Sequence, residues 1–154
     1  MKKSMALTGV VLLVACLWGV SALRSTQPQS SPQSPSSQAC AEDKGIVTSV
    51  TQDLSSLVDT VKKESQQDFD TKYHEQTCIS RLSICSQMTG ELVECLTKAS
   101  KDASTPKEQM SEIQTLLASY TKLKSTLDQD LQTLKGVKNN KAAKAAIAGF
   151  DFSH

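Results

Sequence analysis

The sequence predicts an all-α protein, a small antiparallel bundle of three long helices supported by disulfides. Three observations lead to this fold class: apolar residues recur with helical spacing in three successive stretches, the connections between the stretches are short, and the cysteines lie on or beside the apolar stripes. Short connections between long helices favour antiparallel neighbours. The stripes are therefore expected to converge on one aliphatic core within residues 41–136.

The first helix is expected over residues 42–67, where the apolar side chains occupy one face of a helical wheel. The residues of this face are Val47, Val50, Leu54, Leu57, Val58 and Val61. No glycine or proline ends this helix, but the polar run 65–68 and a candidate N-cap at Asp70 predict a turn near residues 67–71. A single long helix that continues to Leu96 is the alternative.

The second helix is expected over residues 71–101, and its clearest part falls within an arc of about 80° at 100° per residue. The residues of this arc are Cys78, Leu82, Cys85, Leu92 and Leu96. Gly90 lies in the middle of the stretch and costs about 1 kcal/mol there relative to alanine. It therefore marks either a kink or a complete break.

The third helix has the clearest signals at its ends. Thr105 is a candidate cap, Pro106 suits the first helical position, and Glu108 follows as in a capping box. Gly136 is the expected C-terminal stop. The stripe between these ends comprises Met110, Ile113, Leu116, Leu117, Tyr120, Leu123, Leu127, Leu131 and Leu134.

The N-terminal residues 1–22 are expected to form an export signal. Lys2 and Lys3 precede a nearly continuous apolar run, and small residues lead up to the bond between Ala22 and Leu23, where signal peptidase is expected to cut. The run of about 16 residues is shorter than a membrane-spanning helix usually needs. Cleavage is therefore favoured, with no stable membrane insertion afterwards.

A second reading of the signal depends on its cysteine. Residues 13–16, LVAC, resemble the lipobox of bacterial lipoproteins, which implies that Cys16 would become the lipidated first residue of an envelope-anchored chain. In either case residues 23–40 follow as a Ser-, Pro- and Gln-rich linker. This composition buries too little apolar surface to offset the entropy of ordering, so the linker is expected to be disordered.

Charge and aromatic content argue against nucleic acid as a partner. The chain has 17 basic and 16 acidic residues, and cleavage after Ala22 removes Lys2 and Lys3, which leaves 15 basic residues and a net charge of −1. A nearly neutral chain has no field that would gather nucleic acid. Few aromatic residues remain to stack on bases.

Residues 137–154 are expected to form a basic, alanine-rich tail. Lys138, Lys141 and Lys144 recur every three residues. The favoured expectation is that the tail folds back on the acidic first helix or frays. The alternative is a basic amphipathic patch for an anionic surface.

Four cysteines remain after signal cleavage, and an even number in an exported chain predicts disulfides. They are Cys40, Cys78, Cys85 and Cys95. The rise of a helix separates Cys78 from Cys85 by about 10 Å, too far for a bond within one helix. Two pairing schemes remain.

In the first scheme the second helix is continuous, Cys40 bonds Cys95, and Cys78 and Cys85 are free thiols or bond another chain. In the second scheme the chain reverses at Gly90, so that Cys85 bonds Cys95 and Cys40 bonds Cys78. The first scheme is slightly preferred, although it leaves two thiols unexplained in an oxidising compartment.

Catalytic and metal sites are not expected. His74 and Cys78 share a helix face, but a zinc site would need further ligands and reduced thiolates. The sequence has no phosphate-binding Gly-rich loop, no HExxH and no GxSxG. We therefore expect neither an enzyme nor a cofactor.

The leading functional expectation is an exported, non-enzymatic interaction module that binds a protein partner or self-associates through its apolar stripes. The first alternative is an extracellular carrier of an apolar small molecule. The chain is similar to insect odorant-binding proteins in size, signal and helical content, but its successive cysteines are separated by 37, 6 and 9 residues, a spacing those proteins lack. The second alternative is a lipoprotein anchored through Cys16, in the periplasm or envelope of a bacterium.

Overall fold

The computed structural model describes residues 35–152, so the expectations for the export signal, for Cys16 and for most of the linker lie outside the described residues. The described chain contains only α-helices as regular elements, which confirms the predicted all-α class. The helices are α1 (Pro35–Lys63), α2 (Gln66–Thr71), α3 (His74–Lys101), α4 (Lys107–Gly136) and α5 (Asn140–Gly149).

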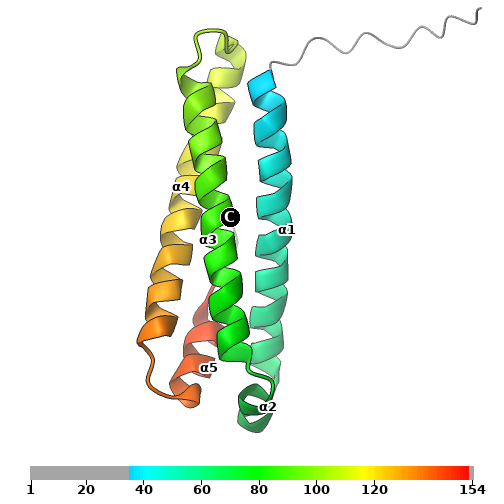
Figure 1. Ribbon diagram of the computed structural model, residues 1–154, viewed down its shortest axis with the longest axis vertical. Helices are drawn as coiled ribbons and strands as arrows, with labels where there is room; N and C mark the ends of the chain where they lie inside the picture. Colours follow the sequence, from blue (N-terminus) through cyan, green and yellow to red (C-terminus); the bar gives the residue numbers. More distant parts are fainter. Residues whose placement is uncertain (1–34, 153–154) are drawn as a thin grey trace, which may run out of the picture. The chain divides into compact units, whose positions relative to one another are not determined.

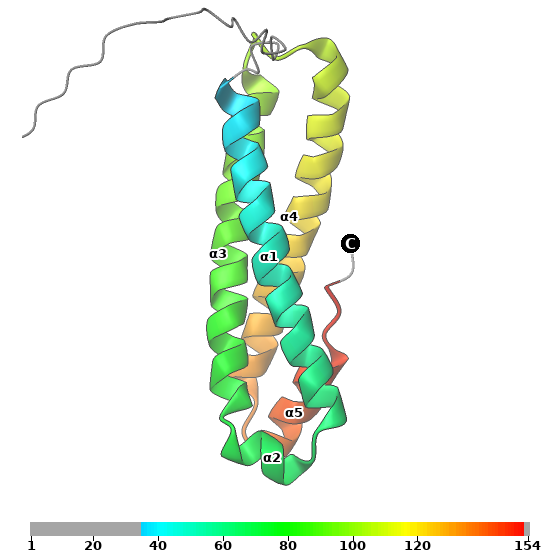
Figure 2. The ribbon, with the colours of Figure 1, turned by 90° about the vertical axis from the view of Figure 1, so that its right-hand side faces the viewer.

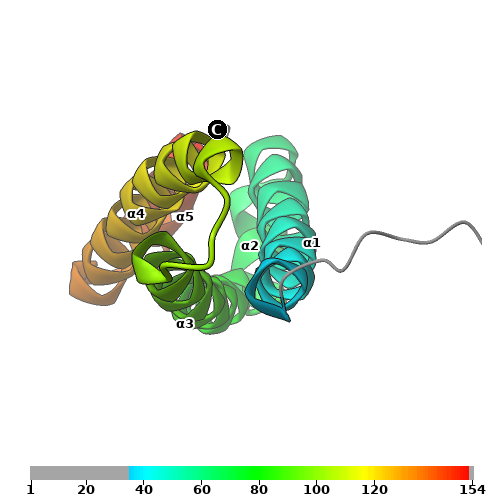
Figure 3. The same cartoon turned by 90° about the horizontal axis from the view of Figure 1, so that it is seen from above.

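The three long helices form an antiparallel bundle with α3 in the middle, as Figure 1 and Figure 2 show. Helix α3 packs along both α1 and α4, whereas α1 and α4 make almost no contact with each other (Figure 3). The core is aliphatic, as expected, with Leu54, Leu82, Leu92 and Leu127 almost completely buried. Among the described residues, no helix combines the length and apolar composition needed to cross a membrane.

Helix α1 begins at Pro35, so it includes the last residues of the segment 23–40 that the sequence predicts to be a linker. Proline is tolerated in the first turn of a helix because its missing N–H would have no intrahelical partner there. Cys40 is bonded to Cys95 of α3, which holds the start of α1 against its neighbour. The helical bundle therefore begins earlier than residue 41.

The turn between the first two long helices contains the short helix α2. The Ser65 hydroxyl caps α2 by accepting from the Asp68 backbone N–H at 3.1 Å, and it donates to the Asp68 carboxylate at 2.7 Å. Phe69 is buried and anchors the turn in the core. Tyr73 then adopts a left-handed backbone with a φ of 54°, which redirects the chain into α3. A single helix from residue 42 to Leu96 is therefore excluded.

Helix α3 continues through Gly90 without the break that the second cysteine scheme requires. A Cβ at position 90 would lie 3.2 Å from Cε of Lys124, so the glycine gives the α4 lysine room to cross α3. The buried Thr89 hydroxyl donates to the Cys85 carbonyl one turn earlier, at 2.7 Å. The helical hydrogen bonding of α3 offsets the propensity cost of a single glycine.

The start of α4 differs from the predicted capping box. The helix begins at Lys107, and neither Thr105 nor Pro106 makes a side-chain cap. Instead, the Thr105 hydroxyl donates to the Ala99 carbonyl at 2.8 Å, because the chain has already turned back over the end of α3. The predicted end of the helix at Gly136 is confirmed.

The segment 137–154 contributes α5 to the bundle, which therefore extends beyond residue 136. The Asn139 side chain caps α5 by accepting from the Ala142 N–H at 2.9 Å. Ala143, Ile147, Phe150 and Phe152 are buried. The segment folds back on α1, as the favoured expectation for the tail has it, and also packs on α4. Burial of apolar side chains accounts for this packing, since no ion pair within the described part of the chain joins a lysine of α5 to an acid of α1.

Candidate functional site

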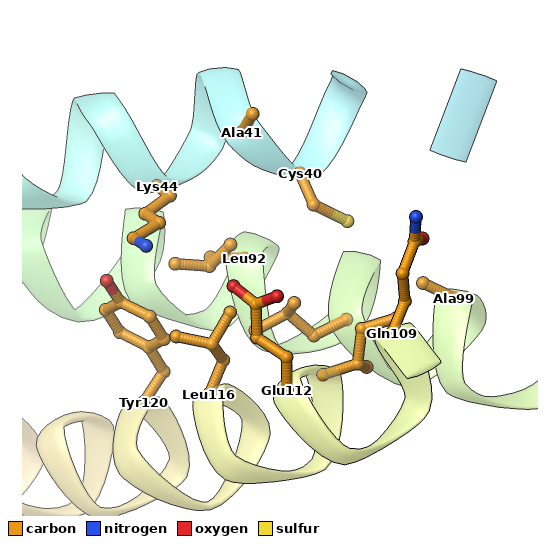
Figure 4. A pocket seen from close by; sticks show the side chains of 11 residues that line it. Cys40, Ala41, Lys44, Leu92, Ala99, Gln109, Glu112, Leu116 and Tyr120 are labelled. Atoms are coloured by element: carbon orange, nitrogen blue, oxygen red, sulfur yellow. The ribbon is translucent and has the colours of Figure 1, made fainter. Parts of the chain in front are cut away.

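An open groove lies between α1 and α4, with α3 as its floor, at the end of the bundle that holds the disulfide. Its volume is about 180 Å³. The floor is formed by the buried side chains of Leu92, Leu96 and Ala99. The walls consist of Cys40, Ala41 and Lys44 on α1, and of Gln109, Glu112, Ile113, Leu116 and Tyr120 on α4 (Figure 4).

The groove is open because the position between α1 and α4 is filled only at the opposite end of the bundle, where α5 packs on both helices (Figure 2). The two halves of α4 differ accordingly. In the half that includes the α5 end, Leu123, Leu127, Leu131 and Leu134 are buried. In the half beside the groove, Ile113, Leu116 and Tyr120 are only half-buried. The apolar stripe of α4 therefore continues past the part that the chain itself covers.

The rim of the groove is polar and carries both signs of charge. Figure 4 shows the Lys44 side chain of α1 and the Tyr120 ring of α4 extending toward each other across the groove. The carboxylate of Glu112 points into the mouth, two helical turns before Tyr120 along α4. Within residues 35–152, neither Lys44 nor Glu112 forms an ion pair. An apolar floor between opposite charges suits a ligand that is apolar on one face and charged at its edges.

The Cys40–Cys95 disulfide joins α1 to α3 beside the groove, with Cα atoms 5.8 Å apart. The bond spans 55 residues, and constraint of an unfolded loop of this length is worth about 4 kcal/mol in the chain-entropy view. At this end of the bundle α1 packs only on α3, and the disulfide links these two helices covalently. The pairing is that of the first cysteine scheme.

Cys78 and Cys85 are free thiols buried in the core, and the disulfide does not involve them. Burial raises the pKa of Cys78 to about 12, with a smaller contribution from the charge of Asp130, and raises the pKa of Cys85 to about 11. The Cys85 thiol donates to the Val50 carbonyl at 3.2 Å. Both residues therefore stay protonated and act as small apolar side chains rather than as nucleophiles.

His74, at the start of α3, contacts the carboxylate of Glu64. Its Nε2 lies 3.0 Å and 3.2 Å from the two carboxylate oxygens of Glu64, whose side chain is 7% exposed. Lys72 approaches the same carboxylate at 3.2 Å. In the part of the chain that the structure describes, no group of three His, Cys, Asp or Glu side chains is placed to hold a metal ion. The contact joins the end of α1 to the start of α3, which is a structural role.

The apolar stripes of the sequence contain five of the groove residues, Leu92, Leu96, Ile113, Leu116 and Tyr120, but the stripe pattern predicts a filled core. Nothing in the periodicity of α1 or α4 indicates that a groove remains between these helices at one end. Charged residues such as Glu112 beside apolar residues occur on any amphipathic helix, so this pattern does not identify a binding site. The groove exists because α5 is short and covers only one end of the position between α1 and α4. This is apparent only in the folded structure.

Comparisons with protein-family models, with curated proteins and with solved structures found no match to this chain.

Proposed function

We propose that the protein is an exported, non-enzymatic interaction module that binds an amphipathic helix in the groove between α1 and α4. The observation that carries the proposal is the half-empty fourth position of the bundle. At one end α5 fills it with Ala143 and Ile147, and at the other end it is a groove with an apolar floor. We expect the ligand to be a helix, because the helix α5 already fills the other end of the same position between α1 and α4.

The side chains of the groove support this mode of binding. Helix-in-groove recognition uses apolar anchors at successive turns of the bound helix, surrounded by a polar rim. Ile113, Leu116 and Tyr120 supply a partly buried apolar wall, and Lys44 and Glu112 supply the rim. Tyrosine is one of the residue types that contribute most to binding energy at protein interfaces, and Ile113 and Leu116 extend the apolar surface beside Tyr120.

Export is proposed on the basis of the N-terminal sequence and the disulfide. Residues 1–22 have the composition of a signal, with cleavage between Ala22 and Leu23, and a disulfide is typical of an oxidising compartment. The protein would then be secreted, or periplasmic if its source is bacterial. Lipidation at Cys16 would instead anchor the same module to the envelope. An intact mass that begins at Leu23 or at a lipidated Cys16 distinguishes the two.

A carrier of an apolar small molecule is the second candidate, and the volume of the groove is the observation that favours it. An enclosed apolar cavity of about 150 Å³ holds benzene in an engineered protein, and the groove measures about 180 Å³. Small-molecule sites usually have about 300–1,000 Å³ and bury most of the ligand. The open side of this groove therefore favours a helix over a small molecule.

Site-specific photo-crosslinking tests the proposed function. A benzophenone amino acid replaces Leu116 in the groove, and a matched variant carries it at Ser125, which lies nine residues along α4 and therefore on its opposite face. Each protein is irradiated with the exported fraction of its host. We expect adducts from position 116 only, with the crosslinked peptide in an amphipathic helix and with competition by the unmodified protein. Equal adducts from both positions, or none from position 116, would contradict the proposal.

A further inference from the structure

We propose that the helix bound in the groove is α4 of a second copy, so that the protein forms a twofold dimer in which Lys44 pairs with Glu112 of the second copy. This inference rests on the proposed function, because it names the partner of the same groove. Three features of the groove support this dimer: the spacing of charged groups along α4, the apolar wall, and the small side chains at the floor.

The first feature is the register of two antiparallel α4 helices, one from each copy. In this register the groove of each copy can bind the α4 of the other. Glu112 and Tyr120 are separated by eight residues of α4, which corresponds to about 12 Å along the helix axis. Leu116 lies midway between them. If two α4 helices pack antiparallel about a twofold axis at Leu116, Glu112 of the second copy lies at the level of Tyr120.

Lys44 makes this register favourable. The Lys44 side chain lies across the groove from Tyr120, so its ammonium group faces the level at which Glu112 of the second copy arrives (Figure 4). The twofold axis repeats the contact, which gives two Lys44–Glu112 pairs per dimer. In the monomer these two charges face the groove without forming an ion pair within the described residues.

The apolar wall is the second feature. Ile113, Leu116 and Tyr120 of α4 are half-buried in the monomer, while the α4 leucines beyond Tyr120 are buried. In the dimer each α4 becomes the missing helix of the other groove, so both apolar walls are covered by the same contact. A twofold interface of this kind uses one surface twice and closes on itself.

Small residues are the third feature, because they let a fourth helix approach the floor. Ala41 of α1 and Ala99 of α3 both line the groove, and neither side chain extends far into it. Ala143 of α5 is completely buried in the same position at the other end. The small side chains of Ala41 and Ala99 therefore leave the floor of the groove accessible to the apolar side chains of an approaching helix.

Sedimentation equilibrium of the full-length chain, expressed with its own N-terminal segment and with the disulfide formed, tests the dimer. The wild-type mass is expected to double between low micromolar and submillimolar concentration. Lys44→Glu and Glu112→Lys should each weaken association by about tenfold or more, because each places like charges at two symmetric contacts. The double variant Lys44→Glu/Glu112→Lys restores the opposite charges and should recover most of the affinity.

The matched control reverses the exposed pair Glu94 and Lys98 on α3, whose charged atoms are 2.7 Å apart outside the groove. Glu94→Lys/Lys98→Glu should leave the dimer unchanged, and circular dichroism confirms that all variants fold. A wild-type chain that stays monomeric, or a dimer that is insensitive to the single reversals, overturns the inference. If the chain is monomeric but position 116 crosslinks to a helix of another protein, the dimer fails while the proposed function stands. If neither is seen, both fail.

Discussion

Asp130 is a carboxyl group whose pKa is raised toward neutrality. It lies on α4, and its Oδ2 is buried without a hydrogen-bond partner in the described part of the chain. Burial raises the pKa of Asp130 to about 6 from its ordinary value of 3.8. The same carboxylate contributes to the raised pKa of Cys78 on α3. At neutral pH the bundle therefore holds a charge that is only partly solvated.

We predict that Asp130→Asn stabilises the protein at pH 7. Because the folded-state pKa is above that of the unfolded chain, the folded protein binds more protons between about pH 4 and pH 6, and the free energy of unfolding falls as pH rises through this window. Partial exposure reduces the effect to about 1 kcal/mol at pH 7. Urea unfolding at pH 4 and pH 7 measures it, with Glu42→Gln on the exposed face of α1 as the control. The same advantage at both pH values would contradict the assignment.

The pairing of the cysteines depends on helix geometry and on packing. Helical rise was sufficient to exclude a bond between Cys78 and Cys85, and it left two pairing schemes. The choice between them depends on whether α3 continues through Gly90. That depends on packing in three dimensions, where Lys124 of α4 crosses the glycine, and helix propensity contains no information about this contact.

Among the elements, α5 determines which part of α4 is covered. Its ten residues pack on α1 and α4 at one end of the bundle and leave the other end open. The periodicity of the long helices was clear in the sequence because each stripe extends over many turns. Helix α5 was hidden by its short length, by its alanines and by three lysines within residues 137–154. The packing of this segment depends on Ile147 of α5 and on Phe150 and Phe152, which follow the helix. These residues are too few to form a recognisable stripe.

The two ends of the bundle should respond differently to loss of an isoleucine. Ile147→Ala removes a completely buried side chain of α5 and should destabilise the protein by about 2–4 kcal/mol. Ile113→Ala removes a half-buried side chain from the groove wall and should cost about 1 kcal/mol or less when the protein is dilute. Urea unfolding at low micromolar concentration compares the two variants. Equal losses would mean that the groove wall is as well packed as the α5 end.

At the scale of the helical bundle, residues 35–152, the groove and α5 are the two halves of one position between α1 and α4. The chain fills one half and leaves the other with an apolar floor and two opposite charges. The unfilled half is the surface on which we propose that a helix binds. The apolar stripes predicted the core and the all-α fold class, whereas the location of the groove follows from where α5 packs on α1 and α4.

Hydrogen exchange along α4 tests the central claim, that the groove is where a helix binds, most directly. In dilute protein the amides of residues 109–120 should exchange faster than those of residues 123–134, because the first half packs on α3 alone. When the groove is occupied, by a second copy at high concentration or by the crosslinked partner, residues 109–120 should gain protection and residues 123–134 should not. Protection of residues 109–120 that is already complete in dilute protein, and that occupancy leaves unchanged, would contradict the account.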